Sequence, residues 1–157
     1  RQWVISLPKR LRGVLGDRPK AVAAVMRIFL DEIEKLLCST HATPPSTRPR
    51  LGAVSFLHRF GSGLNRHAHL HAAVTDGVFL PGPHGPDGPP VFLPARPLTA
   101  ADLAALTERV RRRVIRWFTT PGVKYLTYTL CLAIVGAWHT KTLARCHSRP
   151  KKTFAVA

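Results

Sequence analysis

The sequence predicts an α+β fold, and three observations support that prediction. Two segments place apolar residues at the helical spacing i, i+3, i+4 and i+7. Several shorter runs are rich in β-branched and aromatic residues, as strands are, and glycine- and proline-containing turns separate them. At 157 residues the chain has the length of one ordinary domain and can bury a hydrophobic core.

The first two elements are a strand and a helix. QWVISLP at 2–8 is β-rich and ends at a proline, which predicts a strand. Residues 20–38 predict an amphipathic helix that packs on the core. Its apolar face comprises Val22, Val25, Met26, Phe29, Ile33, Leu36 and Leu37. Asp31 and Lys35 are four residues apart, which predicts an ion pair on the solvent side.

The middle of the chain predicts two hairpins. LGAVSFLHRF at 51–60 and HAHLHAAVT at 67–75 are strand-type runs joined by a glycine-containing turn, and Asp76-Gly77 marks the next turn. VFLP then occurs at both 78–81 and 91–94, on either side of PGPHGPDGPP. This repeat indicates a two-stranded ribbon closed by a disordered Pro/Gly loop.

Residues 99–118 predict the second helix, with Thr99 as its N-cap and Asp102 three residues later. The buried stripe comprises Leu103, Leu106, Val110, Val114 and Trp117. Another face gathers Arg109, Arg112, Arg113 and Arg116. These arginines either form a solvated charged face or contact phosphate groups.

Charge and composition narrow the class of partner. Lys and Arg number 24 against 8 Asp and Glu, a net charge of +16, which favours a nucleic-acid partner over an anionic membrane surface. A merely basic soluble protein is the alternative. The apolar window at 126–138 is too short to span a bilayer. Three cysteines without a CxxC spacing predict neither a disulfide framework nor a thiolate zinc site, which suits a reducing compartment.

Composition also divides the chain near residue 118. Residues 109–157 contain 11 Lys and Arg and no acidic residue, and both helical and strand periodicities fade from Gly122 onward. We therefore expect a core at 1–118 and a divergent, poorly specified basic tail at 119–157.

The most specific pattern is HAHLHAAVTDGVF at 67–79, in which His67, His69 and His71 alternate with small or apolar residues. On a strand, alternate residues share a face, so the three imidazoles would form a row while the opposite face packs on helices. A row of exposed polar residues is the alternative, but the uninterrupted pattern favours a metal site. Imidazole ligands do not select among Zn, Mn, Fe, Ni and Cu.

The stretch LGAVSFLHRFGSGLNRHAHLHAAVTDGVF resembles the core motif of the HUH transposases, specifically the two-tyrosine transposases of rolling-circle insertion sequences. RQWVISLPKRLR is similar to the strand and basic segment that precede this motif. The resemblance covers about 1–118, and it implies an HUH endonuclease-like core: a central antiparallel sheet, its motif histidines on a central strand, with helices packed on one face. The basic segment adds candidate DNA-binding residues, namely Lys9, Arg10 and Arg12.

The resemblance also implies a chemistry. His69 and His71 would hold Mg²⁺ or Mn²⁺, which polarises the scissile phosphate of single-stranded DNA. His67 would be the third ligand or would hydrogen-bond the phosphate, and Asn65 and His58 are weaker candidates. A tyrosine hydroxyl would attack, leaving a 5′-phosphotyrosine and a free 3′-OH.

The chain departs from this family at the nucleophile. The family carries a cysteine-rich zinc module upstream and a tyrosine pair four residues apart downstream, whereas this chain has only Tyr125 and Tyr128, three apart. Tyr125 is the candidate nucleophile, although ordinary packed tyrosines are commoner. We expect a bacterial, cytoplasmic, nucleoid-associated transposase fragment that binds a metal and single-stranded DNA at insertion-sequence ends without turnover. A small self-sufficient nuclease and a non-catalytic basic nucleic-acid-binding protein are the alternatives.

Overall fold

The structure is a computed structural model, and it describes residues 1–6, 15, 17–41, 48–60, 66–82 and 88–120, without the side chains of 66–68. Several sequence predictions therefore lie outside the described residues. They concern Lys9, Arg10, Arg12, Asn65, the loop at 83–87, the tail from 121 onward with both tyrosines, and the side chain of His67.

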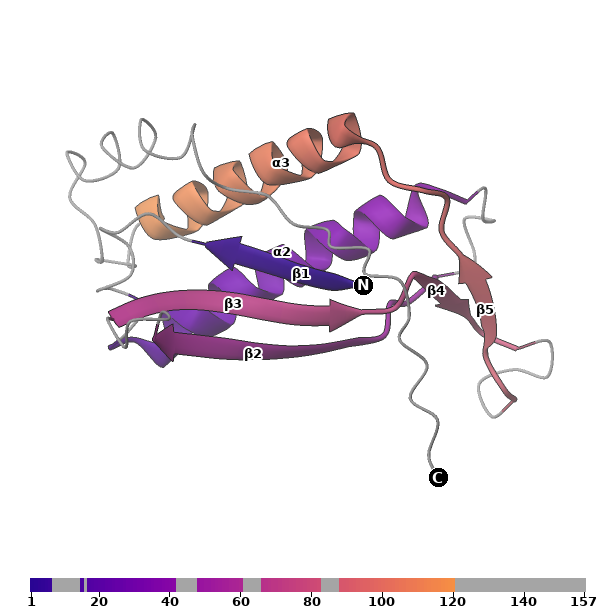
Figure 1. The fold of residues 1–157 in the computed structure, drawn as a ribbon, viewed down its shortest axis with the longest axis horizontal. Coiled ribbons are helices and arrows are strands. Elements are labelled where there is room, and N and C mark those ends of the chain that lie inside the picture. Colours follow the sequence, from indigo (N-terminus) through magenta and orange to yellow (C-terminus); the bar gives the residue numbers. More distant parts are fainter. Residues whose placement is uncertain (7–14, 16, 42–47, 61–65, 83–87, 121–157) are drawn as a thin grey trace, which may run out of the picture.

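A three-stranded antiparallel sheet forms the centre of the molecule (Figure 1). It contains β1 (Gln2–Ser6), β2 (Ala53–Phe60) and β3 (Arg66–Val74), in the order β1-β3-β2. The β2–β3 hairpin is the one that the sequence predicts, and β3 is the central strand, as the resemblance implies. The motif histidines therefore lie on a strand that has a hydrogen-bonded neighbour on each side.

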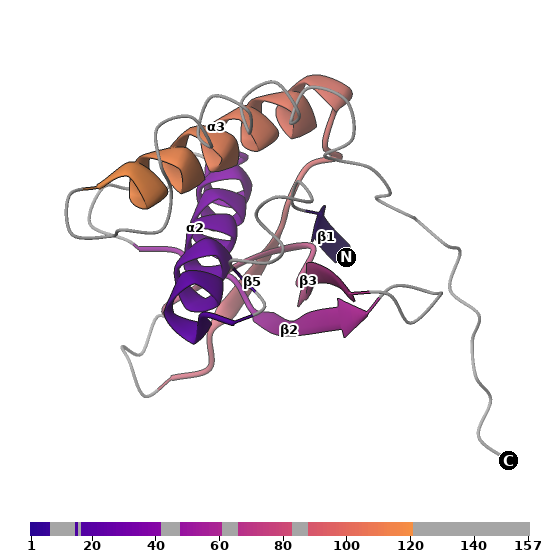
Figure 2. The ribbon, with the colours of Figure 1, turned by 90° about the vertical axis from the view of Figure 1, so that its left-hand side faces the viewer.

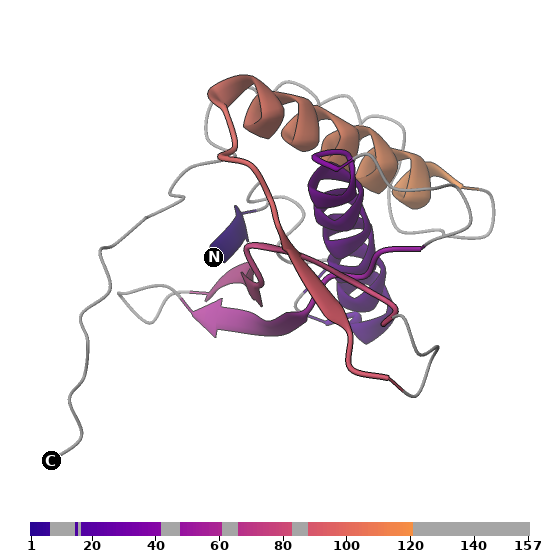
Figure 3. The same ribbon diagram turned by 90° about the vertical axis from the view of Figure 1, so that its right-hand side faces the viewer.

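A second, two-stranded sheet lies beyond one end of the first and corresponds to the predicted ribbon (Figure 1). Figure 3 views the molecule from that end, with the two-stranded sheet in front. It pairs β4 (Gly77–Leu80) with β5 (Val91–Pro94) in antiparallel register. Gly77 opens β4 directly after the turn. A Cβ atom at Gly77 would collide with the backbone carbonyl oxygen of Leu93, so this turn requires glycine.

Both predicted helices are present. α2 (Pro19–Cys38) lies behind the three-stranded sheet, and α3 (Ala100–Thr119) packs across α2 (Figures 1 and 2). The predicted capping of α3 is confirmed, because Thr99 accepts from the Asp102 backbone N–H and the Asp102 carboxylate accepts from the Thr99 backbone N–H. The fold is thus α+β with an antiparallel sheet and its helices on one side. No helix in the described ranges is apolar over a stretch long enough to cross a membrane.

One continuous hydrophobic core joins the sheet to the helices. Leu70 and Ala72 of β3 and Trp3 and Ile5 of β1 face α2, and all four are buried. Each large side chain buried in this way contributes about 1.5–3 kcal/mol before the entropy cost. The prediction of an apolar rear face for β3 is therefore confirmed.

Two details of the helices differ from the sequence prediction. Lys35 donates to Glu32 rather than to Asp31, and Asp31 accepts from Arg113 of α3 instead. On α3 the fully buried stripe runs from Leu106 to Phe118, so Leu103 and Trp117 of the predicted stripe are only partly buried. Four-residue steps from Leu106 lead to Phe118, so Trp117 is only partly buried at the edge of that stripe.

Candidate metal centre

Strand pairing brings three histidines together on the face of the sheet that points away from the core. His58 of β2 stands directly opposite His69 of β3, and Phe56 stands opposite His71. His58 and His71 are therefore diagonal neighbours, and His69 and His71 are two residues apart on the same strand. Directly opposite side chains in an antiparallel pair are about 4.5–5.5 Å apart at Cβ.

The three imidazoles form a compact cluster. The ring centroids of His58 and His71 are 4.2 Å apart and stacked, those of His69 and His71 are 4.8 Å apart, and those of His58 and His69 are 5.2 Å apart. One nitrogen from each ring lies within 4.8 Å of the other two. His58 is exposed, whereas His69 and His71 are half-buried, so the cluster can be reached from solvent.

The environment of His71 favours its neutral form. Burial lowers its pKa below the ordinary value of 6.5, and the positive charges that His58 and His69 would carry lower it further. Neutral imidazole is the form that binds a metal ion, because protonation occupies the lone pair. The cluster thus presents His71 as a ligand at neutral pH.

The two ring nitrogens of His71 have different surroundings. Nδ1 lies 2.9 Å from the side-chain amide nitrogen of Gln2 on β1. Nε2 is buried and has no hydrogen-bond partner among the described residues. A buried polar atom without a partner costs about 1–3 kcal/mol, and a bound cation would remove that cost.

The residues present fit a divalent transition-metal ion. Two ligands that share an ion at about 2.1 Å are at most about 4.2 Å apart, so side-chain rotation must shorten the longest separation of 4.8 Å. The exposed side chain of His58 leaves room for that rotation. Three imidazoles suit Zn²⁺, Fe²⁺, Ni²⁺ and Cu²⁺ best. Mn²⁺ binds nitrogen ligands more weakly than these ions but more readily than Mg²⁺, which prefers oxygen ligands.

The structure changes the ranking of the predicted ligands. It brings His69 and His71 together, as the sequence pattern indicates, and adds His58, which sequence reasoning ranks as a weaker candidate. The side chain of His67 lies outside the description, so its role stays a prediction. The register of the β2–β3 hairpin is the signal that identifies His58, because it aligns His58 with His69.

Comparison with known proteins places this site within a family. A family model described as "Putative transposase" matches residues 52–133, which is 82 of the 157 residues and includes β2, β3 and α3. The chain belongs to this transposase family. The match contains all three clustered histidines, and it extends past residue 118 to include Tyr125 and Tyr128.

A curated protein is similar to this transposase chain over a shorter segment than the family model. Over 79 residues, half of this chain, it is 40% identical to the "Spectinabilin polyketide synthase system protein NorB" of Streptomyces orinoci. The matched segment amounts to 3% of that protein, so the chain spans a small part of its relative. No solved structure matches the chain.

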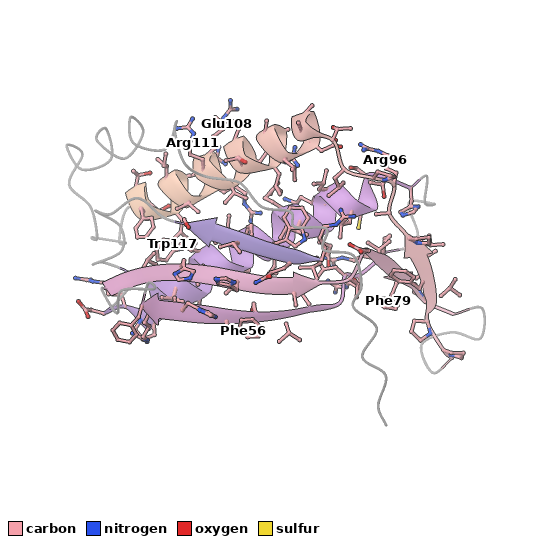
Figure 4. The ribbon with its side chains drawn as sticks, viewed as in Figure 1. Phe56, Phe79, Arg96, Glu108, Arg111 and Trp117 are labelled. Carbon is pink, nitrogen blue, oxygen red and sulfur yellow. The ribbon has the colours of Figure 1, made fainter. Side chains whose placement is uncertain are left out.

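The predicted arginine row of the transposase domain lies on α3, away from the histidine cluster (Figure 2). Arg109 and Arg113 donate to the buried carboxylate of Glu32. Arg112 donates to Glu108, which also accepts from Arg111 on the outer side of the helix (Figure 4). Arg116 is exposed and has no carboxylate partner in the described part of the chain. The sequence-predicted phosphate-binding face therefore remains a prediction, and it is separate from the metal candidate.

The ion pairs of α3 also shift two carboxylate pKa values. Burial raises the pKa of Glu32, but hydrogen bonds from Lys35, Arg113 and Arg109 together outweigh burial and lower it. Hydrogen bonds from Arg111 and Arg112 lower the pKa of Glu108 to about 2. Both carboxylates are consequently charged at neutral pH and hold their arginines in place.

Apolar side chains flank the histidine cluster on β2. Val54 and Phe56 lie on the same face as His58 and are 63% and 47% exposed. The Phe56 and His58 ring centroids are 6.3 Å apart, and Phe56 lies along the middle of β2 (Figure 4). An exposed aromatic ring next to a candidate metal site is a feature that charge and motif analysis did not identify.

Proposed function

We propose that this transposase chain is the metal-binding core of a two-tyrosine HUH transposase and binds single-stranded DNA at insertion-sequence ends. The convergence of His58, His69 and His71 on the open face of the sheet carries the proposal. Family membership supports it, and so does the motif that surrounds these histidines.

In this proposal His58, His69 and His71 hold one divalent ion. Mn²⁺ is the expected ion in vitro, because imidazole nitrogens suit it better than Mg²⁺. When bound, the ion supplies positive charge that polarises the scissile phosphate. The histidines position that charge on a rigid central strand, whose rear face is fixed by the buried Leu70 and Ala72.

The DNA strand would run over the same open face. The net charge of +16 attracts the phosphate backbone. Phe56 presents its ring beside His58, where a base next to the bound phosphate could stack. Unpaired bases can stack in this way, whereas bases within a duplex are already stacked, so the ring favours a single-stranded substrate.

We further propose that this chain supplies no nucleophile, so that it binds DNA without cleaving it. Its two tyrosines are three residues apart rather than four, and neither spacing nor residue type identifies Tyr125 as activated. A self-sufficient nuclease that uses Tyr125 or Tyr128 is the active alternative. A basic nucleic-acid-binding protein without a metal is the inactive one, which the net charge alone would explain.

Three measurements distinguish these three functions. Mn²⁺ is titrated calorimetrically into the chain, and binding of a mixed-sequence single-stranded oligonucleotide is measured with Mn²⁺ or with EDTA. We expect metal-stimulated binding that is lost in the His69→Ala plus His71→Ala variant, and no covalent adduct on a denaturing gel. DNA binding that neither EDTA nor the double substitution weakens would establish the metal-free alternative. An adduct that disappears in Tyr125→Phe would establish the nuclease.

A further inference from the structure

We infer that Gln2 is the positioning residue of the metal centre: its side-chain amide holds Nδ1 of His71, so that Nε2 is the ligand atom. The inference rests on the proposed metal site and extends it to a residue on a third strand. Two independent observations support it, one on each nitrogen of the His71 ring.

The first observation is the contact between strands. β1 lies antiparallel to β3, with Val4 opposite His71 and Gln2 opposite Ala73. Gln2 therefore shares the open face of the sheet with His71 and reaches it diagonally. Its amide nitrogen lies 2.9 Å from His71 Nδ1, within hydrogen-bond distance.

The second observation is the state of the other nitrogen. His71 Nε2 is buried and has no hydrogen-bond partner among the described residues. It belongs to the ring that stacks on His58 at a centroid distance of 4.2 Å. This nitrogen carries either a proton or a lone pair. In both cases no described protein group forms a hydrogen bond with it.

Metal binding resolves both observations at once. An imidazole that coordinates a metal through Nε2 carries its proton on Nδ1, and that N–H needs an acceptor. A half-turn of the Gln2 amide exchanges its oxygen and nitrogen at nearly the same positions. The oxygen then accepts from Nδ1–H, and the Nε2 lone pair points at the ion.

The amide also differs usefully from a carboxylate in this position. A carboxylate would accept the same hydrogen bond but would add a negative charge near the ion. Gln2 is neutral, so it fixes the ring without reducing the positive charge available to a phosphate.

The test replaces Gln2 in the full chain and measures Mn²⁺ affinity by calorimetry. Gln2→Met keeps the length of the side chain but removes the hydrogen bond, and we expect the dissociation constant to rise about 10- to 100-fold. Gln2→Glu keeps an acceptor and should bind Mn²⁺ at least as tightly as the unmodified chain. Arg1→Met is the matched control at the neighbouring position, because Arg1 pairs with Asp76 rather than with the cluster, and it should bind within about threefold of the unmodified chain.

A second readout reports the ring itself. With Zn²⁺ as a diamagnetic probe, ¹⁵N chemical shifts of His71 should show the proton on Nδ1 in the unmodified chain and in Gln2→Glu. Mn²⁺ binding by Gln2→Met that equals the unmodified chain would overturn the role of Gln2 alone. If the unmodified chain binds no Mn²⁺, the metal site itself fails and the inference fails with it.

Discussion

The open face of the sheet and the surface of α3 both carry a periodic row of basic side chains, but the two rows differ in their surroundings. On α3, Arg109 and Arg113 donate to Glu32, and Arg112 donates to Glu108. On the sheet, His58, His69 and His71 cluster with one another, and no carboxylate of the described residues belongs to their group.

The two rows also differ in what their side chains can bind. A guanidinium only donates hydrogen bonds, and nearby carboxylates satisfy it within the protein. A neutral imidazole also has a lone pair, and an external cation is the kind of group that several clustered lone pairs can share. The histidine row is therefore the stronger candidate for a ligand site, although the arginine row is longer.

The largest expected effect distinguishes the third metal ligand. His58→Ala should weaken Mn²⁺ binding more than a hundredfold, because it removes one of three direct ligands, and losing a residue that only hydrogen-bonds to a ligand already costs 10- to 100-fold. His67→Ala should leave affinity nearly unchanged if His58 completes the site. Calorimetric titration of both variants measures the difference. The reverse ranking would show that His67 is the third ligand and that His58 is only a neighbour.

The next effect concerns stability and tests the internal role of α3. Arg113→Met removes a partner of Glu32, whose side chain is only 3% exposed, and should lower the free energy of unfolding by about 3 kcal/mol. Arg116→Met on the same helix should change it by no more than about 0.5 kcal/mol, because Arg116 is exposed. Urea unfolding followed by tryptophan fluorescence measures both values. If Arg113→Met lowers the free energy of unfolding no more than Arg116→Met does, the Glu32 ion pairs contribute little to stability.

Much of the fold could be predicted because its elements carry strong periodic signals. The spacing of Val25, Phe29 and Ile33 fixes the buried face of α2, and the alternation around Leu70 fixes the rear face of β3. Thr99 and Asp102 mark the start of α3 by their own hydrogen bonds. These signals are local, so they can be recognised in the sequence without knowledge of the tertiary structure.

The candidate site was only partly predictable because its remaining members come from other strands. His58 joins the cluster through the register of the hairpin, and Gln2 through the pairing of β1 with β3. Glu32 has the spacing of an ordinary helix residue, yet it is buried and accepts from Arg109 and Arg113 of α3 as well as from Lys35. Such partners depend on which elements become neighbours, and one-dimensional spacing does not contain that information.

A smaller effect tests whether the open face binds DNA bases. Phe56→Ala should weaken binding of a single-stranded oligonucleotide by about 1–3 kcal/mol, the cost of losing one stacked base. Phe92→Ala is the matched control, because Phe92 is 43% exposed, close to the 47% of Phe56, but lies on the β4–β5 ribbon. Fluorescence anisotropy in the presence of Mn²⁺ gives both affinities. Equal losses would mean that exposed aromatic area, rather than position beside His58, determines binding.

The smallest effect returns to α3 and tests whether any part of its row reaches DNA. If Arg112 and Arg116 contact phosphates, replacing either with alanine should reduce the slope of log K against log salt by about 0.7 for single-stranded DNA. Arg109→Ala should leave the slope unchanged, because the Arg109 guanidinium is bonded to the buried Glu32 carboxylate, whereas the Arg112 side chain is 70% exposed and bonds a carboxylate at the surface. Affinities measured between low and moderate salt give the three slopes. If none of them changes, the arginines of α3 serve packing and solubility, and the open face of the sheet alone accounts for binding.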